Sequence, residues 1–324
     1  MFDYFVPFIT CFGASALFGQ AVLQMLKKLK ARQVEREEGP ESHKVKTGTP
    51  TMGGIMFLVP WIIVVAFYLP DHRNILPVMI ATVGFGLVGF VDDFIKVVLK
   101  RNLGLKAYQK FGLQVILALV VCVIIMNHTN VSFDMRVPFT SIFTKSGAPV
   151  MISLGLFAIP FEIIAFGGTV NGANFTDGLD GLAAFVTAVI AIFMAAASAI
   201  TSSGITPAAS AMIGGLLGFL IYNHHPAKVF MGDTGSLALG GFVASCAIMM
   251  NLPIYILIVA FIYLAEVCSV IIQVLYFKAT HGKRFFKMAP IHHHFELSGW
   301  SEVKVTTVFT IVTFVLAIVG LIAI

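Results

Sequence analysis

Charged residues are scarce in this sequence. Asp, Glu, Lys and Arg make up 11% of its 324 residues, whereas 58% are hydrophobic and the mean hydropathy is +0.93. Soluble globular domains carry about a quarter charged residues, so this composition excludes a soluble fold. It predicts a single integral membrane domain over residues 1–324.

Cysteine is also rare. The four cysteines all lie inside apolar segments, at Cys11, Cys122, Cys246 and Cys268. This pattern favours small hydrophobic residues within helices over disulfides or a metal site.

Long apolar stretches, by contrast, are abundant. Ten runs are long enough to cross a bilayer as helices, and they lack the short alternating pattern of barrel strands. The predicted fold class is therefore an all-α polytopic membrane protein with ten transmembrane helices. The runs cover residues 4–26, 53–69, 76–91, 111–126, 150–167, 182–200, 207–222, 236–250, 252–277 and 305–324.

Lysine and arginine are distributed unevenly between the two sides of these runs. The segments after the odd-numbered runs hold 18 of the 21 basic residues, and the other side holds Arg73, Arg136 and Lys145. The positive-inside rule places the basic segments in the cytoplasm and both termini outside it. The net charge of +5 is thus a topology signal and predicts no nucleic-acid partner.

Acidic residues gather on the predicted cytoplasmic side, together with the polar runs "HKVKTGTPTMGG" (43–54) and "APIHHHFELSGW" (289–300). This one-sidedness predicts an active-site cleft at the cytoplasmic face. Five aspartates lie in those loops or helix ends: Asp92, Asp93, Asp177, Asp180 and Asp233.

Two further acids, Glu162 and Glu266, fall within the predicted hydrocarbon region. Charge there is costly and is usually functional or paired, and a protonated or hydrogen-bonded structural role is the alternative. Neither residue is assigned to the reaction centre.

The external segment 127–149 holds β-branched and aromatic residues. This composition predicts a hairpin.

The segment "VDDFIK" (91–96) places two adjacent carboxylates at a membrane exit. On a continuing helix, Lys96 neighbours Asp92 and Asp93 on one face. A surface ion pair is the alternative. Because adjacent carboxylates repel each other, we expect a compensating positive group such as a metal ion.

The segment "NGANFTDGLDGL" (171–182) spaces Asn171, Asn174, Asp177 and Asp180 three residues apart. If the segment is helical, all four line one face. A helix N-cap is the alternative, but one Asp would satisfy it.

The segment "VFMGDTGSLALGG" (229–241) puts Asp233 in a turn that opens a helix. Free N–H groups at a helix N-terminus favour phosphate, and Mg²⁺ takes one or two carboxylates beside phosphate oxygens. A simple cap by Thr234 or Ser236 is the alternative.

The three histidines His292–His294 offer two interpretations. Two histidines with carboxylates can bind zinc, but consecutive helical residues point in different directions. Hydrogen bonds from the imidazoles to phosphates are therefore favoured.

Taken together, the motifs predict phosphoryl transfer, which needs positioning and charge neutralisation. A divalent-metal or proton-coupled transporter is the alternative, although its acids would lie near the bilayer midplane.

Five segments in order, "GTPTMGG", "VDDFIK", "NGANFTDGLDGL", "VFMGDTGS" and "MAPIHHHFELSGW", resemble the polyprenyl-phosphate N-acetylhexosamine-1-phosphate transferases. The first and last are similar to the muramoyl-pentapeptide branch. The resemblance spans residues 43–300 and implies ten helices in the same orientation, in a bacterial plasma membrane.

The resemblance also implies a reaction. Undecaprenyl phosphate attacks the β-phosphate of UDP-N-acetylmuramoyl-pentapeptide, and lipid I and UMP result, with Mg²⁺ as cofactor. Direct attack is favoured over an aspartyl-phosphate intermediate, because a phosphate monoester is mostly dianionic at neutral pH. Family precedent implies a homodimer.

Residue roles follow from the same resemblance. Asp92 or Asp93 matches the proposed base, Asp233 and Asn174 match metal ligands, and His293 lies near the diphosphate. The catalytic set is Asp92, Asp93, Asp233 and His293. The substrate-binding set is Lys44, Thr49, Lys96, Lys110, Asn171, Asn174, Asp177, Asp180, Asn223, Phe230, Gln273, His292 and His294.

Overall fold

The computed structural model describes residues 2–29, 48–99 and 104–324, and this part of the chain is almost entirely helical. Each of the ten predicted runs contains one long helix, so the all-α membrane class is confirmed. These helices are α1 (Phe2–Lys28), α3 (Ile55–Ala66), α4 (Ile75–Val97), α5 (Ala107–His128), α7 (Ala158–Thr176), α8 (Leu182–Thr201), α9 (Thr206–Asn223), α10 (Gly232–Met249), α12 (Phe261–Ala279) and α14 (Glu302–Ala323).

Seven of these helices are long and apolar enough to cross a membrane: α1, α4, α5, α7 with the turn before it, α8, α12 and α14. Helix α3 has 12 residues. Helices α9 and α10 have 18 each and are buried along most of their length. Their small residues let neighbouring backbones approach closely.

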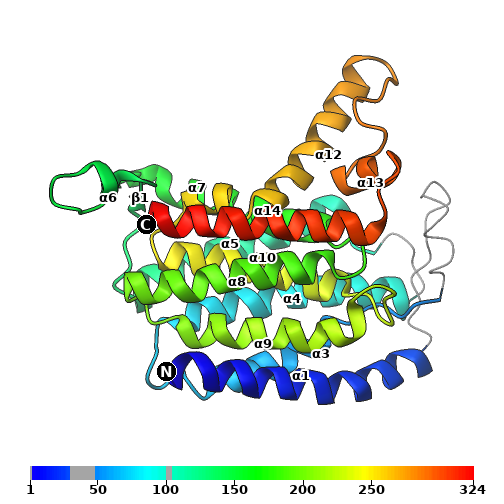
Figure 1. Ribbon diagram of the computed structural model, residues 1–324, viewed down its shortest axis with the longest axis horizontal. Helices are drawn as coiled ribbons and strands as arrows, with labels where there is room; N and C mark the ends of the chain where they lie inside the picture. The colour runs from blue at the N-terminus through cyan, green and yellow to red at the C-terminus, as the bar shows by residue number, and fades with distance from the viewer. Residues whose placement is uncertain (1, 30–47, 100–103) are drawn as a thin grey trace.

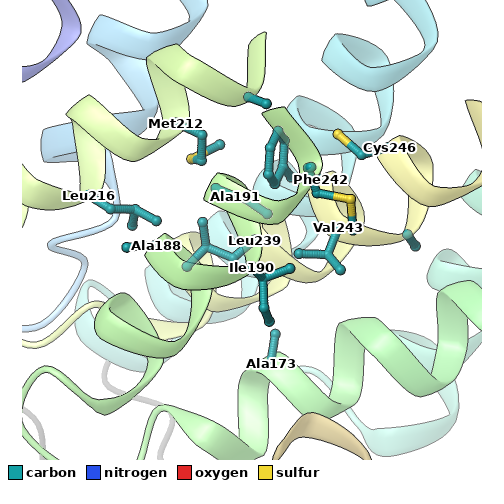
Figure 2. Close-up of a cluster of buried hydrophobic side chains, with 14 of the residues drawn as sticks. Ala173, Ala188, Ile190, Ala191, Met212, Leu216, Leu239, Phe242, Val243 and Cys246 are labelled. Carbon is teal, nitrogen blue, oxygen red and sulfur yellow. The ribbon is translucent and has the colours of Figure 1, made fainter. Parts of the chain in front are cut away.

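Helix α10 lies at the centre of the bundle and packs against α4 and α7, whereas α1 packs against α9 (Figure 1). Figure 2 shows buried side chains from α7, α8, α9 and α10 meeting there, among them Ala173, Ile190, Met212 and Phe242. The contact between α4 and α10 is very close. A Cβ on Gly89 would lie 2.0 Å from the carbonyl oxygen of Asp233.

The ninth run is not one helix. It comprises a 3-10 turn, η2 (Pro253–Tyr255), then α11 (Ile256–Val259), and after Ala260 it continues as α12. Ala260 has φ −100° and ψ 32°, outside helical values, so the direction of the chain changes there. Helix α12 consequently leaves the bundle at an angle, and α13 (Ile291–Glu296) lies beside it (Figure 1).

The fifth run also differs from its predicted limits. Its helix begins at Ala158, because Met151–Ile152 form strand β2, followed by the turn η1 (Gly155–Phe157). Strand β2 pairs antiparallel with β1 (Met135–Arg136), and the short helix α6 (Thr140–Phe143) lies between them. The predicted hairpin thus forms with its second strand just beyond residue 149, and its external position stays a prediction.

Candidate active site

Three aspartates meet where the end of α4 packs against the start of α10. Asp92, Asp93 and Asp233 each offer a carboxylate oxygen, and these atoms lie within 4.8 Å of one another. The close approach at Gly89 brings them together, because it sets the α10 backbone directly against α4. The predicted convergence is confirmed for these three acids.

Asp93 holds the start of α10 in place. Its Oδ1 accepts a hydrogen bond from the Asp233 N–H (3.2 Å), and its Oδ2 accepts from the N–H (2.9 Å) and hydroxyl (2.6 Å) of Thr234. No residue of α10 itself provides a side-chain cap. A carboxylate at a helix N-terminus satisfies unpaired N–H groups and complements the helix dipole. The cap therefore comes from α4, and the alternative of a simple cap by Thr234 or Ser236 does not hold.

Two lysines neutralise the cluster. Lys96 Nζ lies 2.5 Å from Asp92 Oδ2 and 3.0 Å from Asp233 Oδ2, and Lys110 Nζ lies 2.9 Å from the same Asp233 oxygen. Asp92 is 2% exposed, so its pair with Lys96 is not the exposed ion pair considered as an alternative. Its Oδ1 also accepts from the Leu105 N–H at 2.7 Å.

The end of α7 contributes an amide and a further acid. Asn174 Nδ2 donates to Asp233 Oδ1 (2.8 Å) and to Ser236 Oγ (2.9 Å). Asp177 follows in the turn after α7 and accepts from the Gly232 backbone. Burial, reinforced by the negative charges of Asp233 and Asp93, raises the pKa of Asp177 well above its usual value.

The four-residue helical face predicted for this segment does not form, because α7 ends at Thr176. Asn171 points elsewhere and donates to Gln114 Oε1 of α5 at 2.9 Å. Asp180 belongs to a second group, in which its Oδ2 lies 3.1 Å from His225 Nδ1 and its N–H donates to Glu302.

The first and fourth segments, "GTPTMGG" and "VFMGDTGS", are joined through their backbones. The N–H groups of Gly53 and Gly54 donate to the carbonyls of Phe230 (2.8 Å) and Met231 (2.9 Å), and the Phe230 N–H donates to Pro50. Thr49 directly precedes this pairing. The predicted residue Lys44 lies outside the described residues. Asn223, at the end of α9, fixes the next turn by donating to the Val229 carbonyl at 2.9 Å.

The histidines of α13 have three different partners. His292 Nδ1 lies 3.1 Å from Glu266 Oε1, His293 Nδ1 lies 2.9 Å from Glu296 Oε2, and His294 Nδ1 accepts from the Lys287 N–H at 3.1 Å. Among the described residues, none of these three histidines belongs to a group of three side chains that could bind a metal ion. Gln273 of α12 braces the connecting loop by accepting from the N–H groups of Phe285 and Phe286.

The sequence analysis did not identify two residues of the second group, His225 and Glu302. Their possible ligand atoms lie within 4.8 Å of each other and of Asp180. Glu302 lies two residues after the last motif, which ends at Trp300, and this is the one signal that was present. The hydrogen bond from the Asp180 N–H to Glu302 joins residues 122 positions apart, so no local sequence pattern indicates it.

The donor set of the first cluster suits a hard divalent cation, since it offers carboxylate oxygens beside an amide. All three carboxylates already have engaged oxygens, and those of Asp93 accept from the start of α10. These carboxylates, with the Asn174 amide, could hold an ion, and the two ammonium groups lie beside them.

Comparison with known proteins agrees with this site. A family model described as glycosyl transferase family 4 matches residues 75–251. A phospho-N-acetylmuramoyl-pentapeptide-transferase of Acetivibrio thermocellus is 49% identical over 319 residues, which covers 98% of this chain and 94% of the relative. Enzymes of the same name from Clostridium botulinum (45%, 96% and 94%) and Desulforamulus reducens (44%, 98% and 96%) are also similar.

These relatives are bacterial, and the seven spanning helices identify a multi-pass membrane protein. Identity at this level over nearly the full length of both chains is sufficient to assign a family. The chain belongs to the phospho-N-acetylmuramoyl-pentapeptide-transferase family.

Proposed function

We propose that this protein transfers phospho-N-acetylmuramoyl-pentapeptide from its UDP-linked donor to undecaprenyl phosphate, giving lipid I and UMP. The observation that carries the proposal is the position of Asp233. It lies between the ammonium groups of Lys96 and Lys110, at a helix start held by Asp93. Phosphoryl transfer depends on this combination of fixed position and balanced charge.

The reaction exchanges one phosphoanhydride for another. An oxygen of the lipid phosphate forms a bond to the β-phosphorus of the donor, and the bond from that phosphorus to the bridging oxygen breaks, so UMP leaves with the electron pair. We favour direct attack, because the lipid phosphate is mostly dianionic at neutral pH. Asp92 or Asp93 is the candidate base. The oxygens of Asp93 accept from the start of α10, and those of Asp92 pair with Lys96 and accept from the Leu105 N–H.

Mg²⁺, held by Asp233 with Asn174 or Asp92, would neutralise charge on the diphosphate. The chain's own groups share that task. Lys96 and Lys110 are placed to contact phosphate oxygens, and Asn174 fixes the orientation of Asp233. Asp177 and Phe230 are proposed to contact the nucleoside and sugar, and His293 is proposed to lie near the diphosphate and sugar.

We further propose that residues 1–324 form one transferase domain with ten spans, both termini outside the cell and the cleft at the cytoplasmic face. The lipid chain would enter sideways beside α12. An apolar groove of about 360 Å³ lies there, between Phe261 and the α14 residues Ile311, Val312, Val315 and Leu316. Keeping a polyprenyl chain out of water is worth roughly 25 cal/mol per Å² of apolar surface. The homodimer rests on the family resemblance alone.

The test is UMP release by the purified protein in detergent, with the UDP-linked donor, undecaprenyl phosphate and Mg²⁺. We expect release that requires both substrates and stops when a chelator removes divalent ions. Omitting the lipid provides the control for simple hydrolysis. Absence of release from a monodisperse sample with all components present would refute the proposal. Ion uptake by proteoliposomes would then favour the transporter alternative, which the position of the three acids at helix ends otherwise argues against.

A further inference from the structure

Glu266 is a fully buried acid in a helix that is otherwise exposed along much of its surface. Its side chain is 0% exposed, while Ile271, Leu275 and other residues of α12 are exposed. One carboxylate oxygen, Oε1, lies 3.1 Å from His292 Nδ1, and Oε2 has no hydrogen-bond partner among the described residues. A buried carboxyl group retained at this cost usually has a role, and the reaction proposed above does not use it.

His292 is the one histidine of α13 that is fully buried, with 1% of its surface exposed. Its Nδ1 lies within hydrogen-bond distance of the Glu266 carboxyl group, and this contact fixes the orientation of the ring. Its Nε2 is buried and has no hydrogen-bond partner in the described part of the chain. His293 and His294 lack this arrangement, because their partners lie within their own helix or the adjoining loop.

The free nitrogen of His292 faces the turn between α7 and α8. A Cβ on Gly178 would lie 2.2 Å from His292 Nε2 and 2.5 Å from Cε1, so the ring lies against bare backbone. Gly178 is not among the glycines with positive φ. A side chain is therefore excluded at this position by lack of space and not by backbone conformation. The neighbouring residue is Asp177, whose carboxylate meets the start of α10.

These contacts form one path from α12 through α13 to the site: Glu266, His292, Gly178 and Asp177. We propose that Glu266 is a positioning residue, which acts through the His292 ring to set the α7–α8 turn and thereby the place of Asp177. This inference rests on the proposed function, in which Asp177 contacts the UDP-linked donor. The lipid acceptor, which enters beside the apolar groove, does not depend on this path.

The test compares Glu266→Leu with Glu266→Gln. Leucine removes the hydrogen-bond partner of His292 Nδ1, whereas the glutamine amide retains one. We expect Glu266→Leu to raise KM for the donor and to lower kcat/KM for it by about ten-fold or more, with KM for undecaprenyl phosphate unchanged. Glu266→Gln should recover most of that loss. A purely structural role would instead lower the active fraction, which reduces kcat and leaves both KM values unchanged.

A second pair of variants breaks the same path from the other end. Gly178→Ala should reproduce the donor defect, and Gly168→Ala is the matched control because a Cβ there meets no atom within 4 Å. The double variant Glu266→Leu/Gly178→Ala should be no worse than the poorer single variant, since both changes disturb one path. Equal effects of the two glycine variants, or fully additive losses in the double variant, would overturn the proposal. A wild-type protein without UMP release would instead refute the proposed function itself.

Discussion

Replacing Asp233 with asparagine tests the centre of the site most directly. Oδ2 of Asp233 accepts from two ammonium groups, at 3.0 Å and 2.9 Å, and Oδ1 accepts from the Asn174 amide at 2.8 Å. Asparagine has one acceptor oxygen, so its NH₂ group must face either the lysines or the Asn174 amide, and donor meets donor at one end. The charge that would hold a divalent cation is also lost.

The cost of this change differs between stability and catalysis. A lost hydrogen bond to a charged group is worth about 1.5–3 kcal/mol, and the lower end applies here because Lys96 and Lys110 are partly exposed and screened. We therefore expect a folded protein. Loss of a preorganised charge at the reacting phosphates should lower kcat by roughly 10²–10³-fold, about 3–4 kcal/mol in the activation barrier.

The assay is UMP release at saturating donor and lipid over a Mg²⁺ titration, with monodispersity and the thermal midpoint measured beside the wild type. Asp71→Asn is the matched control, because Asp71 is an exposed acid distant in sequence from every site motif. If Asp233→Asn turned over at near the wild-type rate with an unchanged Mg²⁺ dependence, the metal role of Asp233 would be refuted.

Three further variants test the surroundings of Asp233. Asp93→Asn turns an amide NH₂ toward the N–H groups of α10 and should lower the free energy of unfolding by about 1–3 kcal/mol, so an unchanged thermal midpoint in detergent would contradict the cap. The raised pKa of Asp177 stabilises the folded state below the ordinary Asp pKa of about 4, and this stabilisation is lost as pH rises through the raised value. The thermal midpoint of Asp177→Asn should therefore be higher than that of the wild type at roughly pH 8 and equal to it at roughly pH 4. The same difference in midpoint at both pH values would argue against the raised pKa of Asp177. Gly89→Ala should sharply reduce the yield of folded protein, because its Cβ would lie 2.0 Å from a carbonyl oxygen, while Gly112→Ala, with no atom within 4 Å, should not; equal yields would contradict the close packing of α4 and α10.

Local patterns in the sequence were sufficient to predict much of the fold. Each apolar run contained a helix, because hydrophobic length is a property of the run itself. The pairing of Asp92 with Lys96 followed from helical spacing, and Asp233 lay at a helix start as its glycine-flanked turn indicated. These features depend on neighbours within a few residues.

Features set by packing between distant segments could not be predicted in the same way. The cap on α10 comes from Asp93, 140 residues earlier in the chain, and no local motif distinguishes it from Asp92. Asp180 was grouped with the first cluster by spacing alone, but it pairs with His225 and Glu302. The break after Ala260 carries no glycine or proline at that position, so local sequence did not indicate where the ninth run bends.

The cap that α4 supplies to α10 has a consequence for biogenesis. While the chain is being synthesised and inserted, Asp93 enters the membrane well before Thr234 exists, and the last motif follows later still. An incomplete chain therefore has the first carboxylates without the helix start that orders Asp233. Such an intermediate lacks the assembled acidic cluster. Under the proposed function it would therefore be inactive toward the nucleotide donor until the late segments dock on the early ones.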